Sequence, residues 1–325
     1  MEQQTITTNR KRLDYIDLAK GFMILLVVAG HIVQCWFDKS DQEPLHAFLY
    51  SFHMPLFFLL SGYVMGGANL KKLSEQPFCK WLLKKVQTLV IPYVIWRLFV
   101  YRYIDPANAS PLDMDVLWSV VTNSRSGGAW FLMSLFVVQL VSYPAFRYNK
   151  IHTWAIPAIY IIIGMLLGGN EYYCNPYYFA SFIAGRFIFK YYKKVLKHDI
   201  ATIALLGFVS FAWLHPNPMM LTLTAAVVLL YVCLQIEKKN EHMSFLYKKM
   251  IIIGQNTMAI YLLHVLFVFP VVAQHFDASD YRHTMMLTLT LILAFLVSLI
   301  CVGVTDVVAF FPYINLMLFG KKNRI

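Results

Sequence analysis

The chain has 325 residues, of which 59% are hydrophobic and only 14% are charged, and its mean hydropathy is +0.57. This composition excludes an ordinary soluble globular protein and indicates a polytopic, all-α integral membrane protein. The net charge of +11 comes mostly from short segments that border apolar runs, so a nucleic-acid-binding function is not expected.

The first 12 residues are polar and basic, and the apolar run after them is too long and too interrupted by charge for a cleaved signal peptide. The first helix is therefore expected to stay in the mature protein. Segments that can cross a hydrocarbon core of roughly 30 Å recur along the chain. Ten are expected, at 13–37, 45–67, 80–103, 128–146, 153–169, 175–191, 200–215, 218–236, 250–274 and 284–311. The seventh is short and ends in the turn His215-Pro216-Asn217-Pro218, so nine or eight spans are the alternatives.

The loop charges predict the orientation of the chain. With a cytoplasmic N-terminus, 22 of the 28 lysines and arginines fall in inner segments and four fall in outer ones, while Lys20 and Arg97 lie inside helices. The positive-inside rule favours this arrangement. Both termini of a ten-helix protein are therefore expected to be cytoplasmic.

A single domain over residues 1–325 is expected. No loop between the expected helices exceeds about 25 residues, and no repeat or linker interrupts them. The cysteines show no CxxC or metal-ligand spacing, so no metal site is predicted. They are Cys35, Cys79, Cys174, Cys233 and Cys301.

The first membrane segment carries Asp17, Lys20 and His31 on one side. Lys20 and His31 are eleven residues apart, close to three helical turns, which places them on one face about 16 Å apart along the axis. Ionisable groups at membrane depth are costly, so each is a candidate functional residue. The alternative is that Lys20 only neutralises Asp17 in a structural ion pair.

The polar residues of the expected helices form two layers. The outer half of the membrane holds His31, His53, Arg97 and His264, each on a different helix. The layer nearer the cytoplasm holds Asp17, Lys20, Arg186, Gln255 and Asn256. Lysine and arginine suit a phosphate-bearing ligand, and histidine suits proton transfer at neutral pH. A hydrogen bond between helices is the alternative role for His264.

Four segments resemble the membrane acyltransferase-3 family, and they come in that family's order. YIDLAKG at 15–21, leading to Gly30-His31, looks like the opening signature, in which a basic residue precedes a histidine by eleven positions. FHMPLFF at 52–58, followed by Ser61-Gly62-Tyr63, is similar to the family's second helix. GAWFL at 128–132 and NTMAIYLLH at 256–264 resemble two later segments.

The resemblance implies a ten-helix enzyme in a bacterial inner (cytoplasmic) membrane. It implies transfer of an acyl group, usually acetyl from cytoplasmic acetyl-CoA, to a hydroxyl of an envelope glycan, lipid or small molecule. Acetyl-CoA would be a donor substrate and not a permanently bound cofactor. By position, His31 matches the family's essential histidine, Lys20 its basic partner and Asp17 the acidic residue before that partner. Lysine stands where arginine is frequent, which keeps the charge and loses bidentate binding.

Together, the layers and the resemblance predict a site. His31 is expected to act as general base, with an acyl-histidine intermediate as the alternative, and His53 to orient it or to stabilise an oxyanion. The expected donor-binding residues are Lys20, Asp17, Arg186 and Asn256. The expected acceptor-binding residues are Arg97, Trp130 and His264, although an interfacial tryptophan is the alternative for Trp130.

Two other function classes stay open. A transporter or flippase for a glycan or lipid would use the intramembrane charges as its permeation path. A noncatalytic component of an envelope complex would not need His31.

Overall fold

The computed structural model describes residues 13–38, 44–67, 70–103, 114, 118, 129–166, 175–213, 217–239, 244–268, 276–277 and 283–321. The longer helices are α1 (Asp14–Trp36), α2 (Pro44–Gly66), α5 (Ile91–Tyr103), α7 (Trp130–Tyr148), α8 (Ala155–Leu166), α9 (Pro176–Lys190), α11 (His198–Trp213), α12 (Pro218–Lys239), α13 (Phe245–Gln255), α14 (Thr257–Val268) and α15 (His283–Val308). The shorter ones are α3 (Leu70–Glu75), α4 (Phe78–Lys85), the π-helix η2 (Val86–Val90), the 3-10 helix η4 (Ile151–Trp154), α10 (Tyr192–Val195) and α16 (Pro312–Phe319). The strands β1 (Phe37–Asp38) and β2 (Phe276–Asp277) form a parallel pair.

The all-α fold class is confirmed, and each of the ten expected segments contains a helix. Five described helices are long and apolar enough to cross a membrane, namely α1, α2, α7, α12 and α15, and a sixth span results if α13 and α14 count together. The protein is an integral membrane protein on this basis. Ten spans and two cytoplasmic termini stay predictions.

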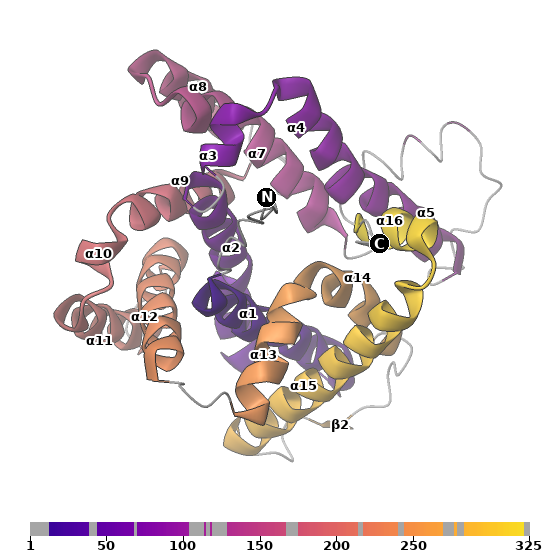
Figure 1. Ribbon diagram of the computed structural model, residues 1–325. Coiled ribbons are helices and arrows are strands. Elements are labelled where there is room, and N and C mark those ends of the chain that lie inside the picture. Colours follow the sequence, from indigo (N-terminus) through magenta and orange to yellow (C-terminus); the bar gives the residue numbers. More distant parts are fainter. Residues whose placement is uncertain are drawn as a thin grey trace, which may run out of the picture.

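Helices α1 and α2 occupy the centre of the molecule, and the other helices surround them (Figure 1). α1 packs against α2, α12, α13, α14 and α15, while α2 packs most extensively against α9. Fifteen of the residues of α1 are buried, including Asp17, because neighbouring helices cover most of its surface. A helix that is apolar nearly all round is expected to be enclosed in this way.

Two glycines allow α2 and α9 to approach closely. A Cβ atom on Gly62 would lie 1.8 Å from the carbonyl oxygen of Phe182, and one on Gly185 would lie 2.0 Å from the carbonyl oxygen of Leu59. Small residues on both sides let helix backbones touch, as is common between membrane helices.

The ninth expected span is not one straight helix. α13 and α14 meet at a bend of 89° beside Asn256. The Asn256 side chain donates to the carbonyl oxygen of Ile252, and Gly254 lies against the backbone of α1, where an added Cβ would be 1.7 Å from the carbonyl oxygen of Asp17. The bend therefore lies where a polar residue pairs with its own helix, next to a close contact between a glycine and α1.

The third expected span contains a π-helical segment. α4, η2 and α5 follow one another without a gap from Phe78 to Tyr103, and η2 forms the middle of this rod. π-helical turns are rare and occur frequently at functional sites. The indole nitrogen of Trp96 donates to the carbonyl oxygen of Leu318 at 3.1 Å, which holds α16 against this rod.

Candidate active site

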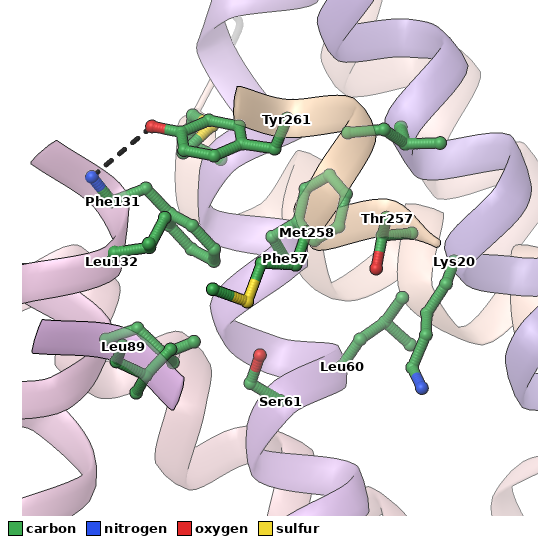
Figure 2. Close-up of a pocket in the computed structure, with 13 residues that line it drawn as sticks. Lys20, Phe57, Leu60, Ser61, Leu89, Phe131, Leu132, Thr257, Met258 and Tyr261 are labelled. Carbon is green, nitrogen blue, oxygen red and sulfur yellow. Dashed lines mark hydrogen bonds between the residues drawn. The ribbon is translucent and has the colours of Figure 1, made fainter. Parts of the chain in front are cut away.

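An apolar cavity of about 180 Å³ lies beside α1, at the level of Lys20. Figure 2 shows its lining, with Lys20 and Thr257 on one side, Leu89 on the other and Tyr261 above. The lining residues come from α1, α2, η2, α7 and α14: Lys20, Ile24, Met54, Phe57, Leu60, Ser61, Leu89, Phe131, Leu132, Leu135, Thr257, Met258 and Tyr261. Lys20 and Ile24 are one turn apart, so the same face of α1 that carries His31 forms one wall.

The segments at 52–58, 128–132 and 256–264 meet at this cavity. The backbone N–H of Phe131 donates to the Tyr261 hydroxyl at 3.4 Å, drawn as a dashed line in Figure 2. The Phe131 ring also packs edge-on against Phe57 and Phe58, with centroids 5.8 and 5.0 Å away. Three motifs that are distant in the sequence thus build one wall and roof.

Lys20 forms the ion pair that its spacing from Asp17 suggests. Its Nζ lies 3.3 Å from Asp17 Oδ1, and the two side chains are 28% and 3% exposed. The carboxylate is buried, whereas the ammonium group stays accessible from the cavity. The ion pair therefore does not prevent Lys20 from meeting a ligand.

A second cavity of about 260 Å³ adjoins the first, because both are lined by Lys20 and Ser61. Its lining is more polar and more basic: Lys20, Ser61, Val64, Met65, Leu73, Gln76, Trp81, Lys84, Lys85 and Gln139. Lys84 and Lys85 close α4 immediately before the π-helical segment. Three lysines around one space make it suitable for an anionic group.

Arg147 braces the edge of this second cavity. Its guanidinium donates to the carbonyl oxygens of Leu73 and Gln76 at 3.1 and 2.6 Å and also bonds the Tyr143 hydroxyl. Leu73 and Gln76 belong to the cavity lining. The connection between α3 and α4 is therefore fixed to α7.

His31 is half-buried and is held by Gln34 and Tyr50. The Tyr50 hydroxyl donates to Gln34 Oε1 at 2.7 Å, and His31 Nδ1 lies 3.1 Å from the same oxygen and 3.1 Å from the Tyr50 hydroxyl. Since an amide oxygen only accepts, His31 Nδ1 carries the proton in this arrangement. Its Nε2 then has the lone pair that a base requires.

His264 and His53 lie around this group. The rings of His31 and His264 are 5.1 Å apart, and His264 Nδ1 donates to the Ile260 carbonyl oxygen at 2.9 Å. His53 Nδ1 donates to the Leu49 carbonyl oxygen at 2.5 Å. Tyr50 packs edge-on against both His31 and His53, so the tyrosine links the two histidines.

The histidine group lies next to the roof of the apolar cavity. The ring of Tyr261, which lines the cavity, is 6.1 Å from that of His264. His264 in turn neighbours His31. The structure thus brings His31, His53 and His264 together next to the cavity that Lys20 lines, and Lys20 is paired with Asp17.

Arg186 and Asn256 make other contacts. Arg186 donates to the Phe146 carbonyl oxygen and to Asn149 Oδ1, both at 3.0 Å, and its guanidinium lies 4.6 Å from the centre of the Phe146 ring. These contacts hold α9 to the end of α7, outside the described lining of both cavities. Asn256 Oδ1 accepts from Lys321 Nζ at 2.5 Å, beside Thr257 of the apolar cavity.

Neither Arg97 nor Trp130 belongs to the described lining of the two cavities. Arg97 is buried on α5, outside the described lining of the two cavities. The Trp130 ring stacks on Tyr178 at 5.5 Å, next to Phe131 of the cavity wall. Among the described residues, no group of three or more His, Cys, Asp or Glu is placed to hold a metal ion.

Several residues of the site are not predicted from the sequence. Gln34, Tyr50 and Tyr261 each lie three residues from a histidine that is predicted, and helical spacing could have found them. Lys84, Lys85 and Gln139 have no such signal. The lysines count as loop charge in the sequence, and Gln139 is a single amide in an apolar helix.

Comparison with known proteins identifies the family. The family model described as "Acyltransferase domain" matches residues 13–306. The proteins named "Nodulation protein NolL" of Mesorhizobium japonicum and Sinorhizobium fredii are 27% and 25% identical over 190 and 198 residues, or 54% and 56% of this chain. The chain spans about half the length of these relatives, 49% and 51%. No solved structure matches. With a family match over nearly the whole chain, the protein belongs to the acyltransferase-3 family.

Proposed function

We propose that this protein transfers an acetyl group from acetyl-CoA to a hydroxyl of an envelope glycan, lipid or small molecule. Membership of an acyltransferase family supports acyl transfer. The observation that carries the finer proposal is the position of Lys20, which lines both a basic cavity and an apolar cavity beneath a histidine group. A nucleotide thioester has charged phosphates and a less polar arm, so its two parts match the basic and the apolar cavity.

The donor is proposed to lie across the two cavities. Its phosphates would meet Lys20, Lys84 and Lys85, and its less polar arm would enter the apolar cavity between Phe131 and Met258. Lysine acts as a point charge toward phosphate, so no bidentate geometry is needed. Arg186, which is engaged by Phe146 and Asn149, is not needed for this arrangement.

His31 is proposed as the general base. Nε2 removes the proton of the acceptor hydroxyl, whose oxygen attacks the thioester carbonyl; the C–O bond forms, the C–S bond breaks, and the imidazolium returns the proton to the departing thiolate. Gln34 and Tyr50 hold His31 in the tautomer that this step requires. His53 acts through Tyr50, as a positioning residue.

An acyl-histidine intermediate is the competing mechanism. Here Nε2 of His31 attacks the thioester carbonyl first, the C–S bond breaks, and the departing thiolate takes up the proton that the acylated imidazolium loses. The acceptor hydroxyl then attacks the acyl-histidine, the C–O bond forms as the C–N bond breaks, and the hydroxyl proton returns to the imidazole. Both routes use the lone pair on Nε2 of His31. Trapping a modified His31 with donor alone distinguishes them.

The acceptor side is proposed to include His264, Trp130 and Arg97. His264 stands closest to His31 among these, and Trp130 offers a ring for stacking on a sugar. The relatives are named nodulation proteins, and the chain covers about half of their length. Their names do not identify an acceptor, so the acceptor class is part of this proposal. The location proposed is a bacterial inner membrane with both termini in the cytoplasm.

Mass spectrometry of envelope glycans and lipids tests the function. Matched strains would carry the wild-type protein or His31→Ala at equal membrane levels. The expected result is an acetyl increment in the wild-type strain that the variant strain lacks. Transport of an unmodified glycan or lipid that survives His31→Ala would instead support a transporter and would contradict the proposal.

A further inference from the structure

Gln139 is a buried amide at the wall of the basic cavity. It lies on α7, its side chain is 5% exposed, and it belongs to the described lining of that cavity. Its Oε1 is buried and has no hydrogen-bond partner among the described residues. Most buried polar atoms in proteins are hydrogen-bonded, so an unpartnered amide oxygen on a residue that lines a cavity indicates a missing ligand group.

Gln139 differs in polarity from its buried neighbours on α7. Leu135 and Val138 on the same helix are buried and apolar, as expected for a helix of a membrane protein. An apolar residue of similar size would fill this position without an unpaired amide. Retaining glutamine there costs stability unless a ligand supplies the partner.

The charges of the cavity indicate which part of a ligand Gln139 meets. Lys84 and Lys85 come from α4 and Lys20 from α1, so the cationic walls belong to other helices than Gln139. A neutral amide presents one donor side and one acceptor side. It therefore complements a neutral group that also carries both, such as an amide or the edge of an adenine ring.

We propose that Gln139 is a specificity-determining residue whose side-chain amide pairs with a neutral donor–acceptor group of the acyl donor, either an amide of the pantetheine arm or the adenine edge. The inference rests on the acyl-CoA donor of the proposed function. It assigns phosphate recognition to the lysines and recognition of the uncharged part to α7.

Binding measurements on the purified full chain test the proposal. The dissociation constants of acetyl-CoA and of S-acetyl-4′-phosphopantetheine, which lacks the adenosine part, would be compared for wild type and Gln139→Leu. Loss of one buried hydrogen-bonded pair is expected to weaken acetyl-CoA binding roughly tenfold. An equal loss for both donors assigns the contact to the pantetheine arm, and a loss for acetyl-CoA alone assigns it to adenine.

Two further variants keep the test specific. Gln235→Leu on α12, outside the described lining of both cavities, is the matched control and should bind like wild type. Gln139→Glu keeps the size of the side chain and adds a negative charge, so it should weaken binding more than Gln139→Leu does. It also replaces the leucine variant if that protein does not fold.

Thermal melting without donor separates this role from a structural one. Gln139→Leu removes an unpartnered amide oxygen, so its melting temperature should equal or exceed that of wild type. An unchanged dissociation constant in Gln139→Leu, with Lys84→Ala and Lys85→Ala weakened, would overturn this inference alone. Failure of the wild-type protein to bind acetyl-CoA would overturn the donor assignment and this inference with it.

Discussion

The imidazole rings of His31 and His264 lie 5.1 Å apart, although they belong to the first and the penultimate long helices of the chain. His264 is anchored through Nδ1 to the Ile260 carbonyl oxygen, while His31 is anchored to Gln34. The two rings differ in access, because His264 is buried and His31 is half-buried. His31 is therefore the more accessible of the two histidines.

Replacing His31 with alanine should abolish acetyl transfer and leave donor binding intact. Loss of a general base typically costs about 10² to 10⁴ in rate, and the proposed phosphate contacts lie elsewhere. Product formation and the thermal shift with CoA would be measured on the purified variant. His198→Ala on exposed α11 is the control. Near-normal turnover of His31→Ala would contradict the mechanism and make His53 the next candidate.

Lys20→Ala should raise the KM for acetyl-CoA more than it lowers kcat. A cation that faces phosphate contributes mainly to ground-state binding. Lys20→Arg should be tolerated because it keeps the charge beside Asp17, and Lys248→Ala, on the exposed surface of α13, should change neither constant. A collapsed kcat at unchanged KM would instead favour a structural or catalytic role for Lys20 through Asp17.

Arg186→Lys should lower stability without changing the KM for acetyl-CoA. Lysine cannot keep both contacts of the guanidinium, to Phe146 and Asn149, and hydrogen bonds to charged groups contribute about 1.5–3 kcal/mol each. Melting in detergent and donor kinetics would be compared with Arg102→Lys, an exposed arginine of α5. A raised KM at unchanged melting temperature would return Arg186 to the donor site that the sequence predicts.

Gly185→Ala should destabilise the protein, whereas Gly303→Ala should not. The added Cβ at position 185 would collide with the Leu59 carbonyl oxygen, while nothing lies within 4 Å of a Cβ at position 303. Overpacking of this kind costs about 1–3 kcal/mol. Thermal melting of the two variants, which carry the same chemical change, measures the difference. Equal melting temperatures would show that α2 and α9 can separate without cost.

The orientation of the chain can be tested with cysteine labelling. In a background without native cysteines, a cysteine at Ser110 is expected outside and should react with an impermeant thiol reagent in intact cells. Residue 110 lies outside the described residues, so this expectation comes from the loop charges. A cysteine at Glu75 is the matched cytoplasmic control. Labelling at 110 only after the membrane is broken would refute the N-in assignment.

Relations within one helix were predictable from the sequence, and contacts between helices were not. The spacing of Asp17, Lys20 and His31 fixes their common face, because helical geometry needs no tertiary information. His31 contacts Tyr50, and Lys84 lines the same basic cavity as Lys20. Both relations depend on how the helices pack against one another. The spacing of residues within one helix does not determine which helices pack against each other.

The bend at Asn256 shows the same limit. The apolar run at 250–274 is long enough to be a single span. Gly254-Gln255-Asn256 interrupts it, but a prediction from length alone does not take these residues into account. The close contact of Gly254 with the Asp17 backbone lies next to the break, and that contact exists only in the folded protein. Arg186 is a similar case, since its place on a helix was predictable and its partners were not.

The same bend has a consequence for biogenesis. α13 and α14 turn by 89°, so this pair cannot settle in a bilayer as an independent straight hydrophobic helix. The corner between the two helices contains Asn256, whose Oδ1 accepts a hydrogen bond from Lys321, the residue that follows α16 and Gly320. The ribosome must therefore have made α16 before the contact between Lys321 and Asn256 can form, and the corner beside Thr257 of the apolar cavity is among the last parts of the protein to assemble during synthesis.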